Sequence, residues 1–308
     1  MISLIVPIWN EENNIVPFIT EVKANLKNEK YEIIFVADPC TDKTIEVVKE
    51  EAINSQEIKL ILMSRRFGQP MAIIAGLKKC IGKCAIVIDV DLQNPPTLLP
   101  EMINLWREGN QVVLPRLRKR YGESPIRSFV ARLAYKTIDR FSEIKMPKNV
   151  SDFRLIDRRV IDQVNLMGER HGFLRGMVAY AGFKTKYIDF DRQPRLTGKT
   201  KYNPLLGSLR IGGNGVFAYS SFGLSLIFNL GILLALISIL ISLIYFIAKV
   251  SGYAFPWGFT SVIMSIFLVG AINMFGLAII GQYIQRIYEE TRPRPRYIIQ
   301  DMINIEKT

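Results

Sequence analysis

The stretch CAIVIDVDLQNPP, residues 84–96, joins an apolar run typical of a buried strand to two acids and to prolines that open a helix. Asp89 and Asp91 are two residues apart, so on an extended strand end their side chains face the same way. Paired carboxylate oxygens suit a hard cation such as Mg²⁺ or Mn²⁺, and Gln93 can add a neutral ligand. The sequence therefore predicts a divalent metal site at Asp89, Asp91 and Gln93.

The chain before this stretch, and shortly after it, alternates apolar strand-like runs with segments of helical spacing. This pattern predicts an α/β fold: a mainly parallel sheet with helices on both faces. Continuous apolar strands agree with burial of both faces of the sheet. The expected strands are Ile2–Ile8, Tyr31–Ala37, Ile58–Ser64, Cys84–Asp89 and Val112–Pro115, with short ones at Asp152–Arg158 and Phe183–Phe190. The expected helices are Glu11–Asn28, Lys43–Ala52, Gly68–Gly82 and one opened by Pro95 and Pro96.

Polar clusters follow several of these strands, where ligands bind in parallel α/β sheets. Asp38 ends the second strand, and its carboxylate can accept hydrogen bonds from a ribose or base; a helix or turn cap is the alternative. The chain has no Gly-x-Gly-x-x-Gly motif and no Walker A lysine. Dinucleotide and P-loop chemistry are therefore not supported, and a nucleotide diphosphate would be neutralised by metal and by Arg or Lys.

The C-terminal third is strongly apolar. Residues 211–248 and 250–285 contain no Asp, Glu, Lys or Arg, and only Lys249 separates them. A membrane span needs about 20 apolar residues, so we expect a hairpin of two transmembrane helices within 211–285, near 224–248 and 257–283. Residues 124–141 read as an interfacial amphipathic helix, with an ordinary surface helix as the alternative. A wholly soluble protein and a many-span transporter are both excluded.

Basic residues are concentrated before this region. The chain carries a formal net charge of +12, and residues 115–210 hold 22 Lys or Arg against 9 Asp or Glu. Such a block suits phospholipid headgroups or a phosphorylated substrate, and nucleic acid is not expected. Positive residues flank the apolar region on one side, which predicts cytoplasmic termini. The expected parts are a cytosolic domain over 1–210 with a membrane-proximal acceptor part from 115, the spans over 211–285, and a cytosolic basic tail over 286–308.

A set of short motifs resembles one family along nearly the whole chain. They are VPIWNEENN (6–14), TDKT (41–44), SRRFGQPMAIIAG (64–76), IDVDLQNPP (88–96), SDFRLIDRRV (151–160), HGFLRG (171–176) and GKTKY (198–202). In this order they resemble the family 2 inverting glycosyltransferases that load a polyprenyl phosphate, the dolichol-phosphate mannose synthase and bactoprenol glucosyltransferase group. The resemblance implies a GT-A-like fold, followed here by interfacial helices and the transmembrane hairpin.

The resemblance also implies roles for individual residues. Asp152 matches the acid near the reacting centre, with Asp91 as the second expected catalytic residue and a metal ligand beside Asp89. The expected donor-binding residues are Pro7, Asn10, Glu11, Asp38, Asp89 and Arg195. The expected ligands of the acceptor phosphate are Arg127, Ser128, Lys199 and Lys201. His171, the single histidine, is expected to be structural.

Two motifs depart from the family pattern. Ala37-Asp38-Pro39-Cys40 stands where the family usually has Asp-Asp-Gly-Ser, and Gly198-Lys199-Thr200-Lys201-Tyr202 stands where Gly-Glu-Ser-Lys-Tyr is common. Asp38 is the retained acid, so donor binding is expected to survive, with altered base selectivity. The changes bear on the sugar and nucleotide more than on the reaction.

The expected function is inverting transfer of a sugar, from UDP-glucose first, to undecaprenyl phosphate at the cytosolic face of the inner (plasma) membrane, with Mg²⁺ or Mn²⁺. A lipid phosphate is already anionic at pH 7, since its second pKa is about 6, so no strong general base is needed. The alternatives are a UDP-N-acetylhexosamine, amino-pentose or GDP-mannose donor, or a non-catalytic membrane scaffold. A processive polysaccharide synthase is not supported, because Gln-x-x-Arg-Trp is missing. Family resemblance implies a homotetramer.

Overall fold

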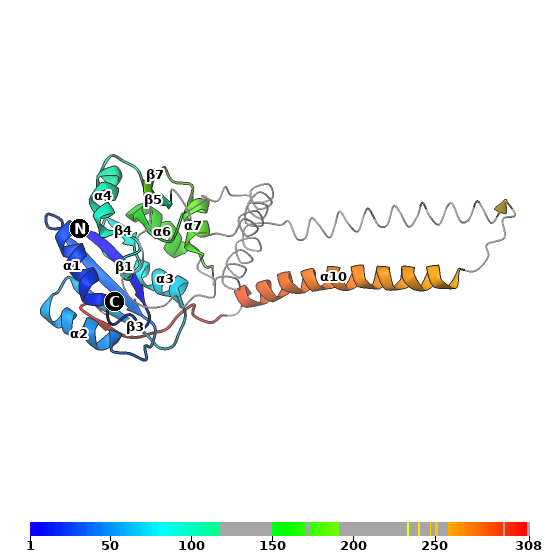
Figure 1. The fold of residues 1–308 in the computed structure, drawn as a ribbon, viewed down its shortest axis with the longest axis horizontal. Helices are drawn as coiled ribbons and strands as arrows, with labels where there is room; N and C mark the ends of the chain where they lie inside the picture. Colours follow the sequence, from blue (N-terminus) through cyan, green and yellow to red (C-terminus); the bar gives the residue numbers. More distant parts are fainter. Residues whose placement is uncertain are drawn as a thin grey trace. The chain divides into compact units, whose positions relative to one another are not determined.

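The computed structural model describes residues 1–117, 150–169, 173–190, 258–291 and 293–306, together with residues 233, 240, 247, 250 and 251. The chain divides into two compact units, drawn in Figure 1. The first comprises Met1–Tyr135, Ile144–Ile211 and Arg294–Thr308, and the second comprises Lys136–Glu143 and Gly212–Pro293.

The first unit is built on an eight-stranded sheet in the order β7-β5-β6-β4-β1-β2-β3-β8. Its strands are β1 (Ile2–Ile8), β2 (Tyr31–Ala37), β3 (Ile58–Met63), β4 (Cys84–Val87), β5 (Val112–Leu117), β6 (Arg154–Asp157), β7 (Thr185–Phe190) and β8 (Ile299–Ile303). The core β4-β1-β2-β3 is parallel throughout. The β5–β7 pair is parallel as well. The β4–β6, β5–β6 and β3–β8 pairs are antiparallel.

Helices cover both faces of this sheet, as the sequence predicts. They are α1 (Ile15–Asn25), α2 (Thr44–Asn54), α3 (Gln69–Lys79), the 3-10 turn η1 (Pro96–Leu98), α4 (Leu99–Arg107), α6 (Arg158–Leu166) and α7 (Leu174–Ala181). Residues of α1, α2 and α4 share one core cluster, and residues of α3, α6 and α7 share the other. Alternate residues of β2 feed the two clusters, Ile33 the first and Ile34 the second. The strand is therefore buried on both faces, which explains its unbroken apolar run.

The sheet is mixed: its β4-β1-β2-β3 core and the β5–β7 pair are parallel as expected, and its other three pairs are antiparallel. The short strand expected near Asp152–Arg158 becomes β6, which lies antiparallel between β4 and β5. The apolar pattern of a strand predicts that it is buried, but it does not give its neighbours or its direction. Because β6 runs against β4, with Arg154 opposite Val87, the start of β6 lies at the carboxyl end of β4.

Within the basic tail expected over 286–308, Ile299–Ile303 form a strand of the sheet. Strand β8 pairs antiparallel with β3 at the edge of the sheet. The Asn304 side-chain amide donates to the carbonyl of Ala52 at 2.7 Å and to that of Ile58 at 2.9 Å. Arg296 donates to the carbonyl of Met167 at 2.9 Å. Residues 294–306 therefore close an edge of the first unit, which reduces unpaired strand surface.

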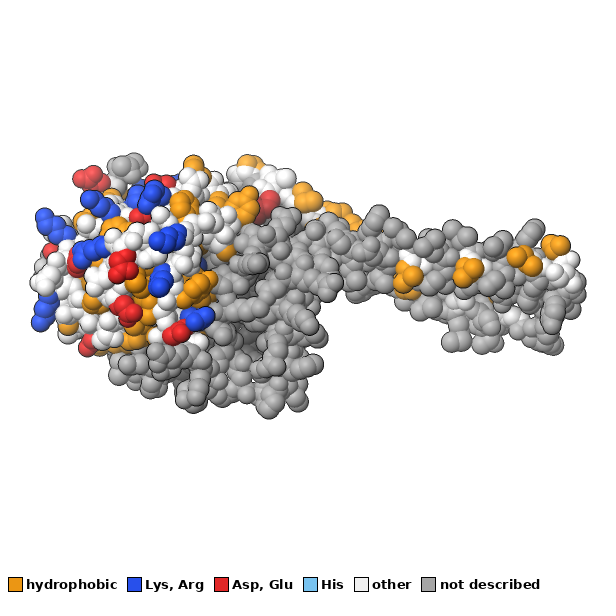
Figure 2. Space-filling view, turned by 90° about the horizontal axis from the view of Figure 1, so that it is seen from above, with side chains coloured by type: hydrophobic (Ala, Val, Ile, Leu, Met, Phe, Trp, Pro, Cys, Tyr) orange, Lys and Arg blue, Asp and Glu red, His pale blue; other side chains and the backbone are white. Residues whose placement is uncertain are grey.

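The second unit contains α10 (Phe259–Thr291), which covers most of the second expected span. In the part of the chain that the structure describes, no helix is long and apolar enough to cross a membrane. The first expected span and the amphipathic helix over 124–141 lie essentially outside the described residues, so the hairpin stays a prediction. Exposed hydrophobic side chains recur in this unit, whereas basic and acidic side chains are interspersed on the face of the first unit that is drawn in Figure 2.

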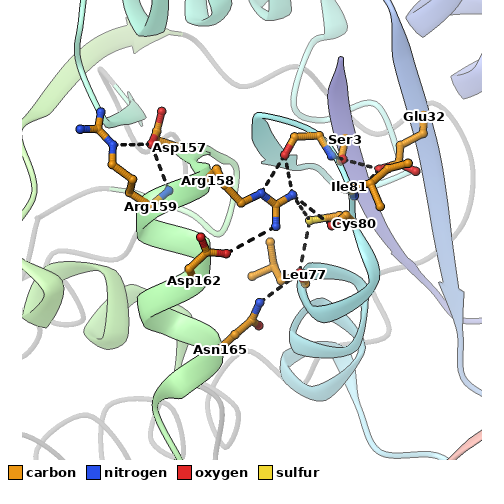
Figure 3. Close-up of polar contacts among 11 residues, drawn as sticks. Ser3, Glu32, Leu77, Cys80, Ile81, Asp157, Arg158, Arg159, Asp162 and Asn165 are labelled. Carbon is orange, nitrogen blue, oxygen red and sulfur yellow. Dashed lines mark hydrogen bonds and ion pairs between the residues drawn. The ribbon is translucent and has the colours of Figure 1, made fainter. Parts of the chain in front are cut away.

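A polar network joins α6 to the turn between α3 and β4 (Figure 3). The Arg158 guanidinium donates to the Cys80 carbonyl at 3.0 Å and to the Gly82 carbonyl at 2.9 Å. Gly82 in turn donates its N–H to the Ser3 hydroxyl at 2.9 Å. Buried Glu32 accepts from the Ile81 N–H at 2.8 Å, and the Lys59 ammonium lies 2.7 Å from its other oxygen. The network gives partners to the carbonyls that follow α3, which would otherwise be unpaired.

Replacing Arg158 by alanine is expected to lower the free energy of unfolding by about 2 kcal/mol, because charge-assisted bonds to two carbonyls are lost. The measurement is denaturant unfolding of the purified full-length chain. Arg159→Ala is the matched control. Its side chain is 67% exposed and pairs with Asp157, so a loss of at most about 1 kcal/mol is expected. Equal losses in the two variants would contradict a structural role for the Arg158 network.

Candidate active site

The loops that carry most of the expected donor residues lie at one edge of the sheet. Strands β4, β1 and β2 are parallel neighbours, so the loops that follow them leave the sheet at their common carboxyl edge. The loop after β1 carries Asn10 and Glu11, the loop after β2 begins with Asp38, and the loop after β4 carries Asp89 and Asp91. Pro7 lies within β1, opposite Val36. These residues therefore lie at strand ends, as the sequence predicts.

The loops after β1 and β2 are fastened to each other by side chains. The Asn10 amide donates to the Thr41 hydroxyl at 2.9 Å, and its oxygen accepts from the Thr41 N–H at 2.8 Å. The Glu11 N–H donates to the Thr44 hydroxyl at 2.7 Å, and the Glu11 carboxylate accepts from Asn14 at 2.6 Å. Asn10 has a φ of 54°, in the left-handed region that asparagine tolerates best among residues with a Cβ. In these contacts, Asn10 and Glu11 shape the loop edge.

Cys40, one of the departures from the family pattern, also takes part in the contact between the loops after β1 and β2. Its sulfur accepts from the Asn10 N–H at 3.3 Å and donates to the Asp38 carbonyl at 3.2 Å. Burial raises the pKa of this thiol, so it is neutral at physiological pH. A thiol at this position therefore acts here as a small polar bridge between the two loops.

Asp38 has a role that sequence reasoning left between nucleotide contact and a cap. Its side chain is buried, and its two oxygens accept the N–H groups of Phe67 and Gly68 at 3.0 and 2.9 Å. Gly68 has a φ of 88° and lies directly before α3. Asp38 therefore holds the distant loop that starts α3. The expected cap role is close to this one, but the sequence does not identify Phe67 and Gly68 as the partners.

That loop leads to the acidic loop after β4. Gln69, the first residue of α3, donates to Asp89 Oδ1 at 2.9 Å, and Asn94 donates to Asp89 Oδ2 at 3.2 Å. Asp91 is buried and accepts the Gln93 N–H at 3.2 Å. Leu92 lies between them with a φ of 57°, an unusual conformation for a bulky residue and a frequent mark of a functional loop.

A turn, and not an extended strand, carries the Asp91 carboxylate in the loop after β4. Strand β4 ends at Val87, two residues before Asp89, so the expectation that an extended strand carries Asp89 and Asp91 is wrong. The donor set still fits a hard divalent cation, because both acids offer oxygen and two amides orient Asp89 from outside. Among the described residues, no group of three or more His, Cys, Asp or Glu side chains could hold a metal ion. The set here is two acids with Gln93 beside them.

Asp152 lies two residues before β6, at the end of the sheet where β4 finishes. Arg175 of α7 reaches both of its oxygens, with Nε at 2.9 Å from Oδ1 and Nη2 at 3.3 Å from Oδ2. The fully buried Arg154 lies 3.8 Å from Oδ1. Burial by itself raises the pKa of Asp152, but the Arg175 and Arg154 charges outweigh it, so the pKa lies below its usual value. Asp152 is therefore an ionised carboxylate at neutral pH.

Arg154 is the largest fully buried side chain of the described residues. It donates to the carbonyls of Ser151 and Asp152 at 2.7 and 3.2 Å. Burial lowers the pKa of Arg154 to about 10, against the opposing effect of Asp152. The guanidinium stays charged at neutral pH and holds the backbone on which Asp152 is mounted.

The sequence analysis missed several candidate functional residues, and several predicted ones lie outside the described residues. Gln69, Asn94 and Arg175 were not predicted, although each stands inside a quoted motif, in SRRFGQ, LQNPP and HGFLRG. No signal in the sequence marks Arg154 as buried. The expected phosphate ligands and His171 lie outside the described residues: Arg127, Ser128, His171, Arg195, Lys199 and Lys201.

Comparison with known proteins gives consistent matches. The family described as "Glycosyl transferase family 2" matches residues 3–164. A Synechocystis protein described as an uncharacterized glycosyltransferase is 35% identical over 309 aligned positions, covering 99% of this chain and 96% of that protein. The bactoprenol glucosyl transferase of Shigella phage SfX is 33% identical over 308 positions, covering 97% of this chain and 98% of the phage protein.

A solved structure supports the fold. Glucosyl-3-phosphoglycerate synthase from Mycobacterium tuberculosis, crystallised with Mn²⁺, UDP and glucosyl-3-phosphoglycerate, is similar with a TM-score of 0.53 at 17% identity. The match covers 70% of this chain and 77% of the synthase. At this identity the likeness concerns the fold, and the family follows from the sequence matches: the chain belongs to glycosyl transferase family 2 and is a glycosyltransferase.

Proposed function

We propose that the chain transfers a sugar from a nucleotide-sugar to a polyprenyl phosphate, with inversion at the anomeric carbon. The observation that carries this proposal is the likeness over nearly the whole chain to relatives named bactoprenol glucosyl transferase. Those names state a sugar, a reaction and an acceptor for the relatives. Since the match includes the apolar C-terminal third, it supports a lipid acceptor here, with undecaprenyl phosphate as the first candidate and UDP-glucose as the first donor.

The acidic loop is the proposed metal and diphosphate end of the site. Asp89 and Asp91 would hold Mg²⁺ or Mn²⁺, with Gln93 beside them, and a structural neighbour was crystallised with Mn²⁺ and UDP. When bound, such an ion neutralises the negative charge that builds up on the leaving diphosphate. The residues of this chain orient the carboxylates: Gln69 and Asn94 each donate to one oxygen of Asp89. Asp38 secures the turn from which Gln69 projects.

Asp152 is the proposed acid at the acceptor side. An ionised carboxylate with both oxygens engaged by Arg175 is a weak proton acceptor, and a phosphate acceptor with a second pKa of about 6 does not need a strong one. We therefore assign Asp152 to orienting the acceptor. Arg127, Ser128, Arg195, Lys199 and Lys201 keep their expected role as phosphate ligands, supported by their place in the basic block.

The membrane arrangement is part of the proposal. The uncharged stretches within 211–285 support a two-helix hairpin, and the flanking Arg residues support a catalytic domain and termini on the cytoplasmic side. An anchored enzyme meets its lipid acceptor in two dimensions, which restricts the geometry of encounter. We propose an inner-membrane, multi-pass protein, with a tetramer as the expected assembly.

The test is transfer of labelled sugar from a panel of UDP- and GDP-sugars to undecaprenyl phosphate by the full-length chain in detergent. We expect a lipid-linked product that requires Mg²⁺ or Mn²⁺ and disappears with a chelator, because the diphosphate then leaves without charge neutralisation. Restoring the metal should restore the product. A folded chain that forms no product from any donor would overturn the proposal and favour a membrane scaffold that retains the fold.

A further inference from the structure

The ion pair between Arg175 and Asp152 joins two elements that are separate in the chain. Arg175 lies in the first turn of α7, and Asp152 lies just before β6. The guanidinium meets both carboxylate oxygens, at 2.9 and 3.3 Å. A two-pronged contact of this kind fixes the plane of a carboxylate as well as its position, which a single hydrogen bond from a lysine does not.

The Arg175–Asp152 ion pair positions the carboxylate and contributes little to the stability of the chain. The two side chains are 29% and 28% exposed, and ion pairs with such access to water contribute little to stability. Arg175 also borders a pocket of about 120 Å³, which is lined by Leu114, Arg154 and Tyr187 among others. Because there is open space beside the guanidinium, hydrogen bonding matters more than close packing in holding the pair together.

Arg154 and Arg175 contact different parts of the Asp152 region. Arg154 is fully buried and binds the carbonyls of Ser151 and Asp152, so it fixes the backbone. Arg175 binds the carboxylate itself. Loss of Arg175 would leave the backbone in place and free the side chain to turn, which is what distinguishes a positioning residue from a structural one.

We propose that Arg175 is a positioning residue of the transfer reaction, holding the Asp152 carboxylate in the single orientation that the acceptor requires. This inference rests on the proposed function, since it assumes that Asp152 serves sugar transfer. Arg175 touches Asp152 and acts through it. Neither the fold nor the reaction class by itself assigns a role to this arginine.

The test compares Arg175→Lys and Arg175→Ala with Arg159→Lys in the full-length chain. Arg159 is the matched control, because it pairs at 3.0 Å with Asp157, the acid at the other end of β6. We expect kcat to fall on the order of 10²-fold in R175A and about tenfold in R175K, because the carboxylate is misplaced. Arg159→Lys is expected to stay within about twofold of the unsubstituted chain.

A double-mutant cycle with Asp152→Asn separates positioning from a direct role. If Arg175 acts only through the Asp152 carboxylate, its substitution should lower kcat no further in the D152N background, because interacting residues are not additive. Independent, multiplying losses would overturn the inference. R175K keeps the charge, so it carries the cycle if R175A does not fold.

The pH profile gives a second readout that a structural role would not move. The charged side chains that act on Asp152 are Arg175 of α7 and Arg154 of β6, and Tyr187 of β7 lines the adjoining pocket. Arg175 lowers the pKa of Asp152, so its removal raises that pKa. If the ionised acid is required, activity is lost as pH falls through the higher of this folded pKa and the second pKa of the acceptor phosphate, about 6, so an acid limb that moves to higher pH in R175A supports the inference.

The outcomes separate the inference from the function on which it rests. No transfer by the unsubstituted chain means that the proposed function has failed, and the role of Arg175 fails with it. Full transfer with R175K and R175A equal to R159K overturns the role of Arg175 alone.

Discussion

Replacing Asp91 by asparagine is expected to lower kcat/KM for sugar transfer by about 10³-fold, equivalent to about 4 kcal/mol of transition-state stabilisation. Asp91 is buried, and its carboxylate accepts the Gln93 N–H at 3.2 Å. Asparagine keeps the shape and can still accept that bond, but it removes the charge. The change therefore removes the charge of the proposed metal ligand while keeping that hydrogen bond.

The measurement is the initial rate of lipid-linked product over a titration of Mg²⁺ or Mn²⁺. We expect D91N to need a higher metal concentration for half-maximal rate and to remain slower at saturation, since a neutral amide binds a divalent cation less well. Asp162→Asn is the control, because Asp162 is 57% exposed on α6. An unchanged metal requirement in D91N, with the rate intact, would sink the assignment of Asp91 to the metal.

Asp89 offers a less direct test of the same site. Both of its oxygens accept amide N–H groups, from Gln69 and Asn94, so an asparagine at this position would turn one of its own N–H groups toward a donor. D89N therefore combines loss of charge with a rearranged loop. For this reason a rate loss in D89N would not by itself separate metal binding from local structure.

The sequence predicts where most strands and helices lie along the chain, but it does not predict the order of the strands in the sheet. The apolar runs locate β1 to β5 to within a few residues because each strand is buried on both faces, and burial leaves a local trace. The insertion of β6 between β4 and β5 leaves none, because it depends on contacts across about 70 positions of chain, such as Cys84 with Asp157. Strand β8 is equally hidden, since IQDMI at Ile299–Ile303 is short, half-exposed and follows a stretch rich in arginine and proline.

The same limit applies to the site. The positions of Asp38, Asp89 and Asp91 at strand ends follow from the pattern, because parallel strands bring their carboxyl ends to one edge. What holds these acids does not follow. Asp38 binds Phe67 and Gly68 across about 30 positions of chain. Each of these partners lies in a quoted motif, but a motif shows that a residue matters without showing what it touches.

The departure at Ala37-Asp38-Pro39-Cys40 has a structural account. Ala37 is fully buried in the core at the end of β2, where an acid would need a partner or would lose stability. Cys40 bridges the loops after β1 and β2 through Asn10. The loop thus keeps Asp38 and its link to α3 while losing an acid beside it, which is consistent with retained chemistry and a changed donor pocket.

Replacing Asp152 by asparagine is expected to lower kcat on the order of 10² to 10³-fold and also to destabilise the chain. The rate falls because, under the proposed role, the ionised Asp152 carboxylate is needed to orient the acceptor, and the amide removes its charge. Stability falls because the fully buried Arg154 loses a counter-charge 3.8 Å away. Both effects arise at one carboxylate, so activity must be expressed per folded enzyme and unfolding measured separately.

Asp157→Asn is the control for that experiment, since it makes the same substitution at the other end of β6. Asp157 accepts the Trp106 indole N–H at 2.7 Å and caps α6 through the Arg159 N–H, so D157N should lower stability while leaving kcat per folded enzyme unchanged. The stability of the unsubstituted chain should also depend on Asp152 at low pH. Its lowered pKa gives a contribution that is present near neutral pH and is lost as pH falls through the folded value. D152N should lack this acid-dependent part, and an identical acid unfolding midpoint in D152N and the unsubstituted chain would show that the Asp152 charge is not held by Arg175 and Arg154 as the structure describes.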